Sequence, residues 1–158
     1  MSEEDVQEAF SLEEQEPQIA ISLRDRVSDE EVSERMGEML PEVLAYALSC
    51  GAEVAGPPYS RYFEITPDEI DFECGIPVAA PVPVTESYQV SELPGGKAAA
   101  ALHRGPYDRL ILTWQALSRW VSEQGMQQAG PGWEVYVTDP QQEPDPSLWE
   151  TRVYIPVA

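Results

Sequence analysis

The first part of the chain alternates in polarity and then changes to helical spacing. Apolar and polar residues alternate over 19–24, which predicts a half-buried strand. Ser28 and Glu31 have the spacing of a capping box, and apolar residues then follow a helical period up to Gly51. We therefore expect a capped helix that ends at Gly51. Pro41 lies inside this pattern and predicts either a kink or two abutting helices.

Two more strands follow in this half, over residues 59–64 and 71–78, after a Gly-Pro-Pro turn. Residues 80–96 are rich in proline and glycine and form a connection, with one further strand expected around Tyr88. The first half thus has the order strand, helix, strand, strand.

The second half repeats this order. A strand of small residues covers 97–103, and Asp108 is expected to cap a helix that ends at Gly125. Two strands, over 133–138 and 149–156, complete the half.

Identical or similar residues recur between the halves at fixed spacing, which indicates an internal repeat. Five positions recur 74 residues later, and Ile76-Pro77-Val78 recurs 79 residues later as Ile155-Pro156-Val157. The five are Gly51, Gly56, Pro57, Tyr59 and Tyr62, which become Gly125, Gly130, Pro131, Trp133 and Tyr136.

Two such modules predict an α+β fold, with two pseudo-twofold-related strand-helix-strand-strand modules that form one antiparallel sheet. The helices cover one face, and a groove lies at the centre. We expect a single domain over 18–158, with module one at 18–79, the connection at 80–96 and module two at 97–158. The acidic residues 1–17 predict a disordered tail that is too short for a helix-turn-helix.

The charge is strongly negative, with 29 acidic and nine basic residues and a net charge of −20. Of the acidic residues, 22 lie in 1–93. Such a field repels phosphate, so we expect no direct binding to nucleic acid or to an anionic membrane. The alternative explanation of the negative charge is that the acidic surface only keeps the protein soluble. The acidic start has no apolar run, and no stretch reaches the ~20 apolar residues of a membrane span.

Few residues indicate metal or redox chemistry. Cys50 and Cys74 form neither a disulfide framework nor a metal motif, and we expect free, buried, reduced thiols in a cytoplasmic protein. His103 is the one histidine, and a structural role is expected for it. We expect no metal and no cofactor.

Alternation along the last strands sorts the candidate site residues by face. We expect Trp133, Val135 and Val137 to join the apolar face under the helices, together with Thr151, Val153 and Ile155. The opposite face then carries an acid among tyrosines, which is the set of residues with the most chemical content. It comprises Glu134, Tyr136, Tyr62, Glu150, Arg152 and Tyr154. The alternative is a glutamate on a solvated face that pairs with Arg152, a kind of pair worth about 0–1 kcal/mol.

Three segments carry a resemblance to a known family. The run Leu102-His-Arg-Gly-Pro-Tyr-Asp-Arg-Leu110, followed by Trp114, Leu117, Trp120 and Gly125, resembles the second half of GyrI-like proteins. So do Trp133-Glu-Val-Tyr-Val-Thr-Asp-Pro140 and Thr151-Arg-Val-Tyr-Ile-Pro-Val157. The resemblance covers residues 18–158. It implies the small-molecule-binding domain that is fused to many AraC- and MerR-type multidrug regulators and is also found alone.

The resemblance also implies roles for particular residues. In the family, a glutamate of the Glu-x-Tyr strand lies at the groove floor and meets ligands, often cationic aromatic ones. That role falls to Glu134, with Tyr136 and Trp133 as neighbouring aromatic positions. Position 152 is usually acidic in the family and is Arg152 here, which would weaken a preference for cations if it reached Glu134.

Three functions remain open. The first is a stand-alone binder of small, aromatic molecules. The second is a hydrolase of electrophilic cyclopropanoid compounds, with Glu134 as general base and Tyr136 as acid, since some family members have this activity. The third is an acidic interaction protein such as a gyrase modulator, as the family's namesake inhibits DNA gyrase.

Overall fold

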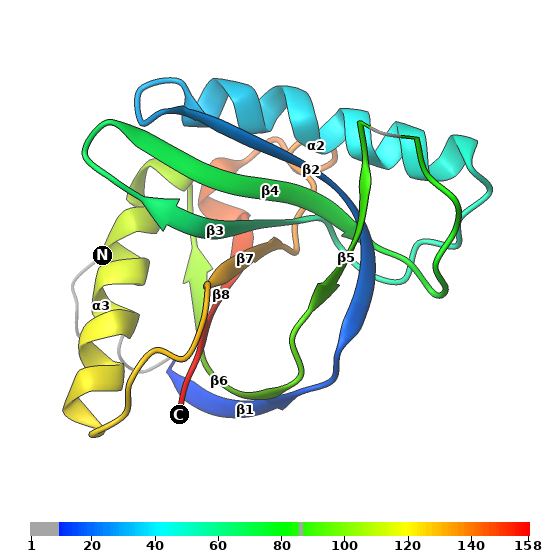
Figure 1. Cartoon of the computed structure of the whole chain (residues 1–158). Coiled ribbons are helices and arrows are strands. Elements are labelled where there is room, and N and C mark those ends of the chain that lie inside the picture. The colour runs from blue at the N-terminus through cyan, green and yellow to red at the C-terminus, as the bar shows by residue number, and fades with distance from the viewer. Residues whose placement is uncertain (1–9, 86) are drawn as a thin grey trace. The chain divides into compact units, whose positions relative to one another are not determined.

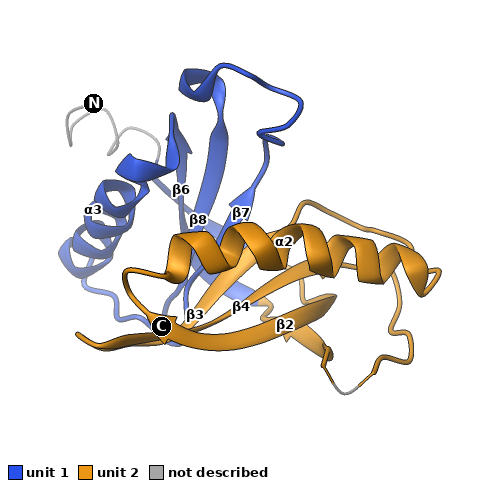
Figure 2. Ribbon diagram, turned by 90° about the horizontal axis from the view of Figure 1, so that it is seen from above, with its two compact units in different colours: residues 1–15, 96–158 blue, residues 16–95 orange. Residues whose placement is uncertain are grey.

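The computed structural model describes residues 10–85 and 87–158, and the chain forms two compact units (Figures 1 and 2). One unit consists of residues 16–95, and the other joins residues 96–158 to the N-terminal segment up to Gln15. We call them the 16–95 unit and the 96–158 unit, and each is described by itself.

The 16–95 unit is an antiparallel sheet with a helix on one face. Its strands pair in the order β5-β2-β4-β3, and α2 packs on β2 and β4. Buried side chains of α2, β2 and β4 form its apolar core, with Met39, Val43, Ile21, Phe72 and Ile76 among them. The elements are β2 (Gln18–Ser28), α2 (Val32–Ser49), β3 (Tyr59–Ile65), β4 (Glu69–Pro77) and β5 (Gln89–Leu93).

The 96–158 unit has the same plan. Its strands pair antiparallel in the order β1-β6-β8-β7, and α3 packs on β6 and β8. Its core includes Ala99, Ala101, Leu117, Val153 and Ile155. The elements are β1 (Ser11–Gln15), β6 (Gly96–Arg104), the 3-10 turn η1 (Tyr107–Arg109), α3 (Leu110–Glu123), β7 (Trp133–Tyr136), the 3-10 turn η2 (Pro146–Leu148) and β8 (Glu150–Pro156).

The turn after each helix repeats in detail. Gly51 and Gly125 follow α2 and α3 with φ of +75° and +76°, a conformation that glycine adopts without a steric cost. Three residues beyond each glycine, a single bridge pairs the loop with the residue that follows the last strand: Val54 with Val78, and Gln128 with Val157. The recurring glycines Gly51 and Gly125 therefore mark equivalent turns.

The predicted α+β class, with antiparallel strands and one helix per module, is confirmed. The strand expected near Tyr88 is β5. The prediction of a disordered tail over residues 1–17 is wrong for Ser11–Gln15, which form β1 and pair with β6. Residues 1–9 of that tail lie outside the described residues.

Both predicted helix caps are wrong. Ser28 donates its hydroxyl hydrogen bond to the Glu31 carboxylate at 2.7 Å, so it does not cap a backbone N–H, and Glu31 makes no side-chain cap either. Asp108 lies inside η1, and α3 begins at Leu110 without a side-chain cap. The alternative of two abutting helices at Pro41 is also wrong, because α2 runs through it.

Cys74 is buried, whereas Cys50 is partly exposed, and no disulfide joins them. In the described part of the chain, no helix combines the length and the hydropathy of a membrane span.

The face of the 16–95 sheet away from α2 contains a buried acid–phenol pair. Tyr59 is fully buried and donates its hydroxyl hydrogen bond to the carboxylate of Glu73, which is 2% exposed. The Tyr59 ring lies across Gly75, the residue opposite it on β4. Burial raises the pKa of Glu73, although hydrogen bonds from Tyr59 and Ser91 act against the rise.

We predict that Gly75→Ala destabilises the protein. A Cβ at this position would lie 2.5 Å from the Tyr59 hydroxyl oxygen. Because the ring is buried, it cannot move aside without disturbing its neighbours, and we expect a loss of about 1–3 kcal/mol in the free energy of unfolding, measured in urea. The matched control is Gly37→Ala in α2, where a Cβ meets nothing within 4 Å. There we expect a gain of about 0.5–1 kcal/mol. Equal effects of the two substitutions would contradict the prediction.

A second prediction concerns pH. The pKa of Glu73 is raised above its ordinary value of 4.5 in the folded protein. The unfolded chain therefore releases this proton at lower pH than the folded chain does. Wild-type stability should then fall as the pH rises from the ordinary pKa through the folded pKa. Glu73→Gln cannot titrate, so it should gain stability relative to wild type across this window in urea melts at about pH 4 to about pH 8. A constant difference between the two proteins would argue against a buried, titrating Glu73.

Candidate functional site

Cross-strand pairing fixes which side chains of β7 face α3. Glu134 pairs with Val153 and Tyr136 pairs with Thr151 on β8. Directly paired residues share a face of the sheet. Val153 belongs to the core beneath α3, so Glu134 and Tyr136 lie on the face that α3 covers.

The predicted assignment of faces on β7 is therefore wrong. Trp133 pairs with Tyr154 and Val135 pairs with Arg152, so these four residues share the face away from α3. The prediction placed the more apolar set of β7 under the helix. The structure places an acid there instead, because the helix and the strand supply hydrogen-bond donors for it.

Two donors hold the Glu134 carboxylate. Trp114 of α3 donates from Nε1 to Oε1 at 2.8 Å, and Tyr136 donates its hydroxyl hydrogen bond to Oε2 at 2.5 Å. Glu134 is 3% exposed and Tyr136 is 8% exposed. Hydrogen bonds to a charged acceptor contribute about 1.5–3 kcal/mol each, which offsets part of the cost of removing a carboxylate from water.

Two further aromatic rings extend this arrangement toward solvent. The Tyr107 ring meets the Tyr136 ring edge-on at 5.7 Å between centroids, and it lies 5.0 Å from the Trp149 ring. Tyr107 is 37% exposed. Its pKa is raised, first by burial and then by the negative charges of Glu134 and Asp139. We call Tyr107, Trp114, Glu134, Tyr136 and Trp149 the acid–aromatic cluster.

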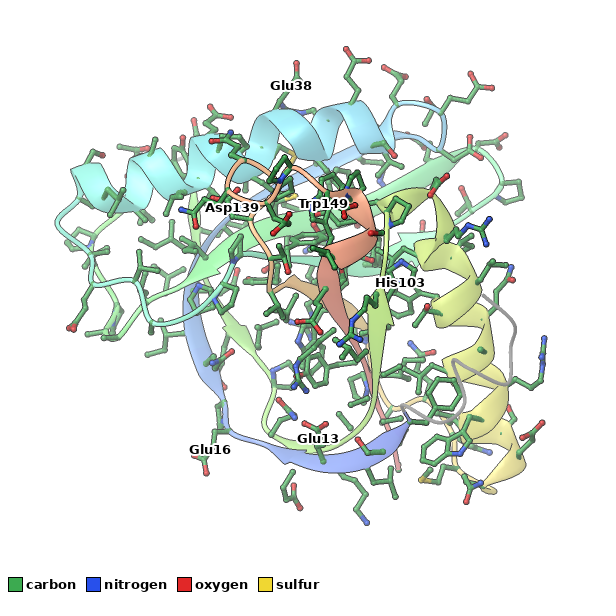
Figure 3. All side chains as sticks on the ribbon, turned by 180° about the vertical axis from the view of Figure 1, so that it is seen from behind. Glu13, Glu16, Glu38, His103, Asp139 and Trp149 are labelled. Atoms are coloured by element: carbon green, nitrogen blue, oxygen red, sulfur yellow. The ribbon has the colours of Figure 1, made fainter. Side chains whose placement is uncertain are left out.

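His103 connects the cluster's turn to α3. Figure 3 shows His103 on β6 and Trp149 ahead of β8. The buried imidazole lies 2.8 Å from the Thr113 hydroxyl through Nδ1 and 3.0 Å from the Pro106 carbonyl through Nε2. A carbonyl only accepts, so Nε2 carries the proton. Pro106 precedes Tyr107, and the histidine therefore fixes the backbone next to one ring of the cluster, in keeping with the predicted structural role.

Gly132 brings Trp114 close to the strand. A Cβ at this position would lie 2.7 Å from the Trp114 ring and 3.0 Å from the backbone oxygen of Tyr154. Any larger residue would displace the indole that donates to Glu134.

Arg152 does not pair with Glu134. It lies on the other face of the sheet, where Nη1 is 3.8 Å from a carboxylate oxygen of Glu13 on β1. The alternative of a solvated glutamate paired with Arg152 is therefore wrong. Trp133 and Tyr154 share this face and stack on each other with 5.2 Å between centroids.

Tyr62 belongs to the 16–95 unit. It packs against the core beneath α2, and its hydroxyl lies 3.9 Å from the sulfur of Met36. Of the predicted ligand-binding residues, Glu134 and Tyr136 therefore lie on the face covered by α3, and Tyr62 lies in the other unit. The remaining three lie on the opposite face of the same sheet: Trp133, Arg152 and Tyr154.

The sequence-based prediction missed three members of the cluster: Tyr107, Trp114 and Trp149. The first two lie in the Gly-Pro-Tyr motif and on the apolar side of a predicted helix, and both were visible in the sequence as such. The sequence pattern did not show on which face of β7 the side chain of Glu134 lies. An acid under the helix requires a hydrogen-bond donor from the helix. Trp114 is the residue of α3 that supplies it.

The cluster offers one carboxylate, donor groups that orient it, and the faces and edges of four aromatic rings. Negative charge beside aromatic rings attracts cations, and planar groups pack well on such rings. No three potential metal ligands lie together among residues 10–85 and 87–158, so no metal site is assigned there.

Three solved structures with similar folds span nearly the whole chain. The C-terminal domain of EcmrR aligns with a TM-score of 0.84 at 21% identity, covering 94% of this chain and 96% of that one. SAV2435 bound to tetraphenylphosphonium aligns with a TM-score of 0.60 at 10% identity, covering 94% and 93%. A structure described as a hydrolase from Listeria innocua aligns with a TM-score of 0.60 at 11% identity, covering 95% and 92%.

Among curated proteins, no relative matches the chain. The family model of the GyrI-like small molecule binding domain, by contrast, matches residues 8–158. This range includes every residue that the structure describes, and with them the whole acid–aromatic cluster. The chain therefore belongs to the family of GyrI-like small-molecule-binding domains.

Proposed function

We propose that this protein binds aromatic, cationic small molecules at the acid–aromatic cluster. The observation that carries the proposal is the Glu134 carboxylate, which is buried and held by the indole N–H of Trp114 and the hydroxyl of Tyr136. In the similar structure of SAV2435, the bound molecule is tetraphenylphosphonium, an aromatic cation.

The physical basis is the attraction between a cation and a carboxylate that is shielded from water. A carboxylate away from water interacts more strongly with a cation than an exposed one does. Aromatic faces add about 0.5–2 kcal/mol for each cation–π contact. Tyr107 and Trp149 offer ring surface toward the exposed side of the cluster. Arg152 lies on the opposite face of the sheet and pairs with Glu13, so it leaves the preference for cations intact.

The charge of Glu134 can be tested with two ions of the same shape, tetraphenylphosphonium and tetraphenylborate. We predict that wild type binds the cation, and that Glu134→Gln weakens this binding by about tenfold or more, because a charge-assisted interaction is lost. Binding of the anion should stay weak or improve in the variant. Isothermal titration calorimetry with each ion measures both affinities.

The matched control is Glu150→Gln in the same unit. Glu150 accepts a hydrogen bond from Arg104 at 2.8 Å and lies outside the cluster. This variant loses the same charge and should bind the cation as wild type does. Equal weakening by Glu134→Gln and Glu150→Gln would mean that the general negative field attracts the cation, and the proposed site would be wrong.

A hydrolase is the second candidate, and one contact favours it. The hydroxyl of Tyr136 donates to the Glu134 carboxylate, so a general base and a general acid already share a hydrogen bond. If the protein is such an enzyme, incubation with an electrophilic cyclopropanoid should yield a ring-opened product that carries water, detected by mass spectrometry. Glu134→Gln should abolish this product. Recovery of unchanged substrate from wild type would eliminate this chemistry. The third hypothesis, an acidic interaction protein, stays a prediction from charge.

A further inference from the structure

Thr151 is a buried hydroxyl residue whose hydrogen-bonding capacity is unmet. It is 0% exposed, and no atom of residues 10–85 and 87–158 forms a hydrogen bond with its Oγ1. Arg61 Nε is the other buried atom of this kind in the described residues, but its guanidinium still donates through Nη1 to the Glu92 carbonyl. Oγ1 is the one polar atom of the Thr151 side chain, so that side chain is wholly unsatisfied.

The register places this hydroxyl within the acid–aromatic cluster. Thr151 pairs with His103 on β6 and with Tyr136 on β7, so the three side chains form a row on the face covered by α3. Both neighbours direct polar atoms elsewhere: His103 to Thr113 and Pro106, and Tyr136 to Glu134. At one end of the row, Tyr136 donates to the carboxylate of Glu134, whereas the hydroxyl of Thr151 at the middle has no partner among the described residues.

An unsatisfied hydroxyl in a core is costly. Burying one without a partner costs about 1–3 kcal/mol, and most buried polar atoms in proteins have a partner. Valine has nearly the same shape as threonine and no such cost, and it occurs two residues further along β8 at Val153. A threonine at this position is therefore explained best by a partner that residues 10–85 and 87–158 do not supply.

We propose that Thr151 is a specificity-determining residue, and that its hydroxyl accepts a hydrogen bond from a ligand bound at the acid–aromatic cluster. The inference rests on the proposed function and narrows the ligand class to aromatic cations that carry N–H groups, such as protonated amines and amidines. Quaternary cations, which have no N–H, satisfy Glu134 but leave Thr151 unsatisfied.

The spacing of the two acceptors agrees with such a ligand. Glu134 and Thr151 are diagonal neighbours on adjacent strands, because Tyr136 rather than Glu134 pairs with Thr151. Diagonal neighbours lie about 7–8 Å apart, and less between side-chain atoms. One ammonium or amidinium group between them donates to both, since each N–H···O bond spans about 2.9 Å. Tyr107, which is partly exposed, is the ring nearest to solvent that such a ligand would contact.

The test uses two compounds with the same ring system and charge. They are 4-phenylbenzylammonium, which has three N–H groups, and its N,N,N-trimethyl derivative, which has none. Calorimetry or fluorescence titration measures both affinities for wild type, Thr151→Val, Thr151→Ser and Glu134→Gln. Thermal unfolding checks that each variant folds. Thr151→Val should be at least as stable as wild type, because it removes an unsatisfied buried group.

We expect Thr151→Val to weaken binding of the ammonium compound by about tenfold and to change binding of the trimethyl compound by less than about twofold. Thr151→Ser should restore most of the lost affinity, since it keeps the hydroxyl. Glu134→Gln should weaken both compounds.

Other results would show whether the Thr151 inference alone fails or whether the proposed function fails as well. Suppose that both compounds bind, that Glu134→Gln weakens the binding of both, and that Thr151→Val changes the two affinities equally or not at all. The Thr151 hydroxyl then makes no hydrogen bond to the ligand, and its partner is the protein itself or a buried water. The specificity inference is then wrong while the proposed function stands. If neither compound binds to wild type, or if Glu134→Gln has no effect, the proposed function fails and the inference fails with it.

Discussion

The acid–aromatic cluster of the 96–158 unit depends on one condition: a carboxylate beneath a helix must receive hydrogen bonds from groups that replace water. Removing an ionised carboxylate from water without such partners costs several kcal/mol. Trp114 and Tyr136 meet this condition from two different elements, α3 and β7. The position of α3, the close approach at Gly132 and the face of β7 are therefore linked to each other through Glu134.

Each unit buries a carboxylate that accepts a hydrogen bond from a tyrosine, but the two pairs lie on different faces relative to the helix. In the 96–158 unit, the acid–phenol pair of Glu134 and Tyr136 faces the helix. In the 16–95 unit, the pair of Glu73 and Tyr59 lies on the face away from its helix. The strand order and the turns after the helices are the same in both units. Similar backbones with different buried acids are what one expects when the sheet sets the fold and individual positions set the chemistry.

Much of the fold could be predicted from the sequence, because period and turn residues are local signals. Alternation predicted the strands, and the glycines after each helix marked turns that the structure confirms. The face of β7 could not be predicted in this way. In a strand of four residues, either alternating pair could face the helix. Which pair does so depends on a hydrogen-bond donor, Trp114, that is 20 residues away in the sequence from Glu134. Likewise β1 is a strand because it pairs with β6, and nothing in its own acidic sequence shows that.

The acid–aromatic cluster combines a fixed part with a more exposed part. Trp114 and Glu134 lie on regular elements, and the indole has little room to move because Gly132 lies against it. Groups held in this way recognise charge without a cost of reorganisation. Tyr107 and Trp149 instead lie in a 3-10 turn and at the end of a loop; Tyr107 is exposed and Trp149 is partly buried. Aromatic rings in such positions adapt to ligands of different outline. Under the proposed function, the carboxylate would select the charge of the ligand, and the outer rings would accept ligands of several shapes.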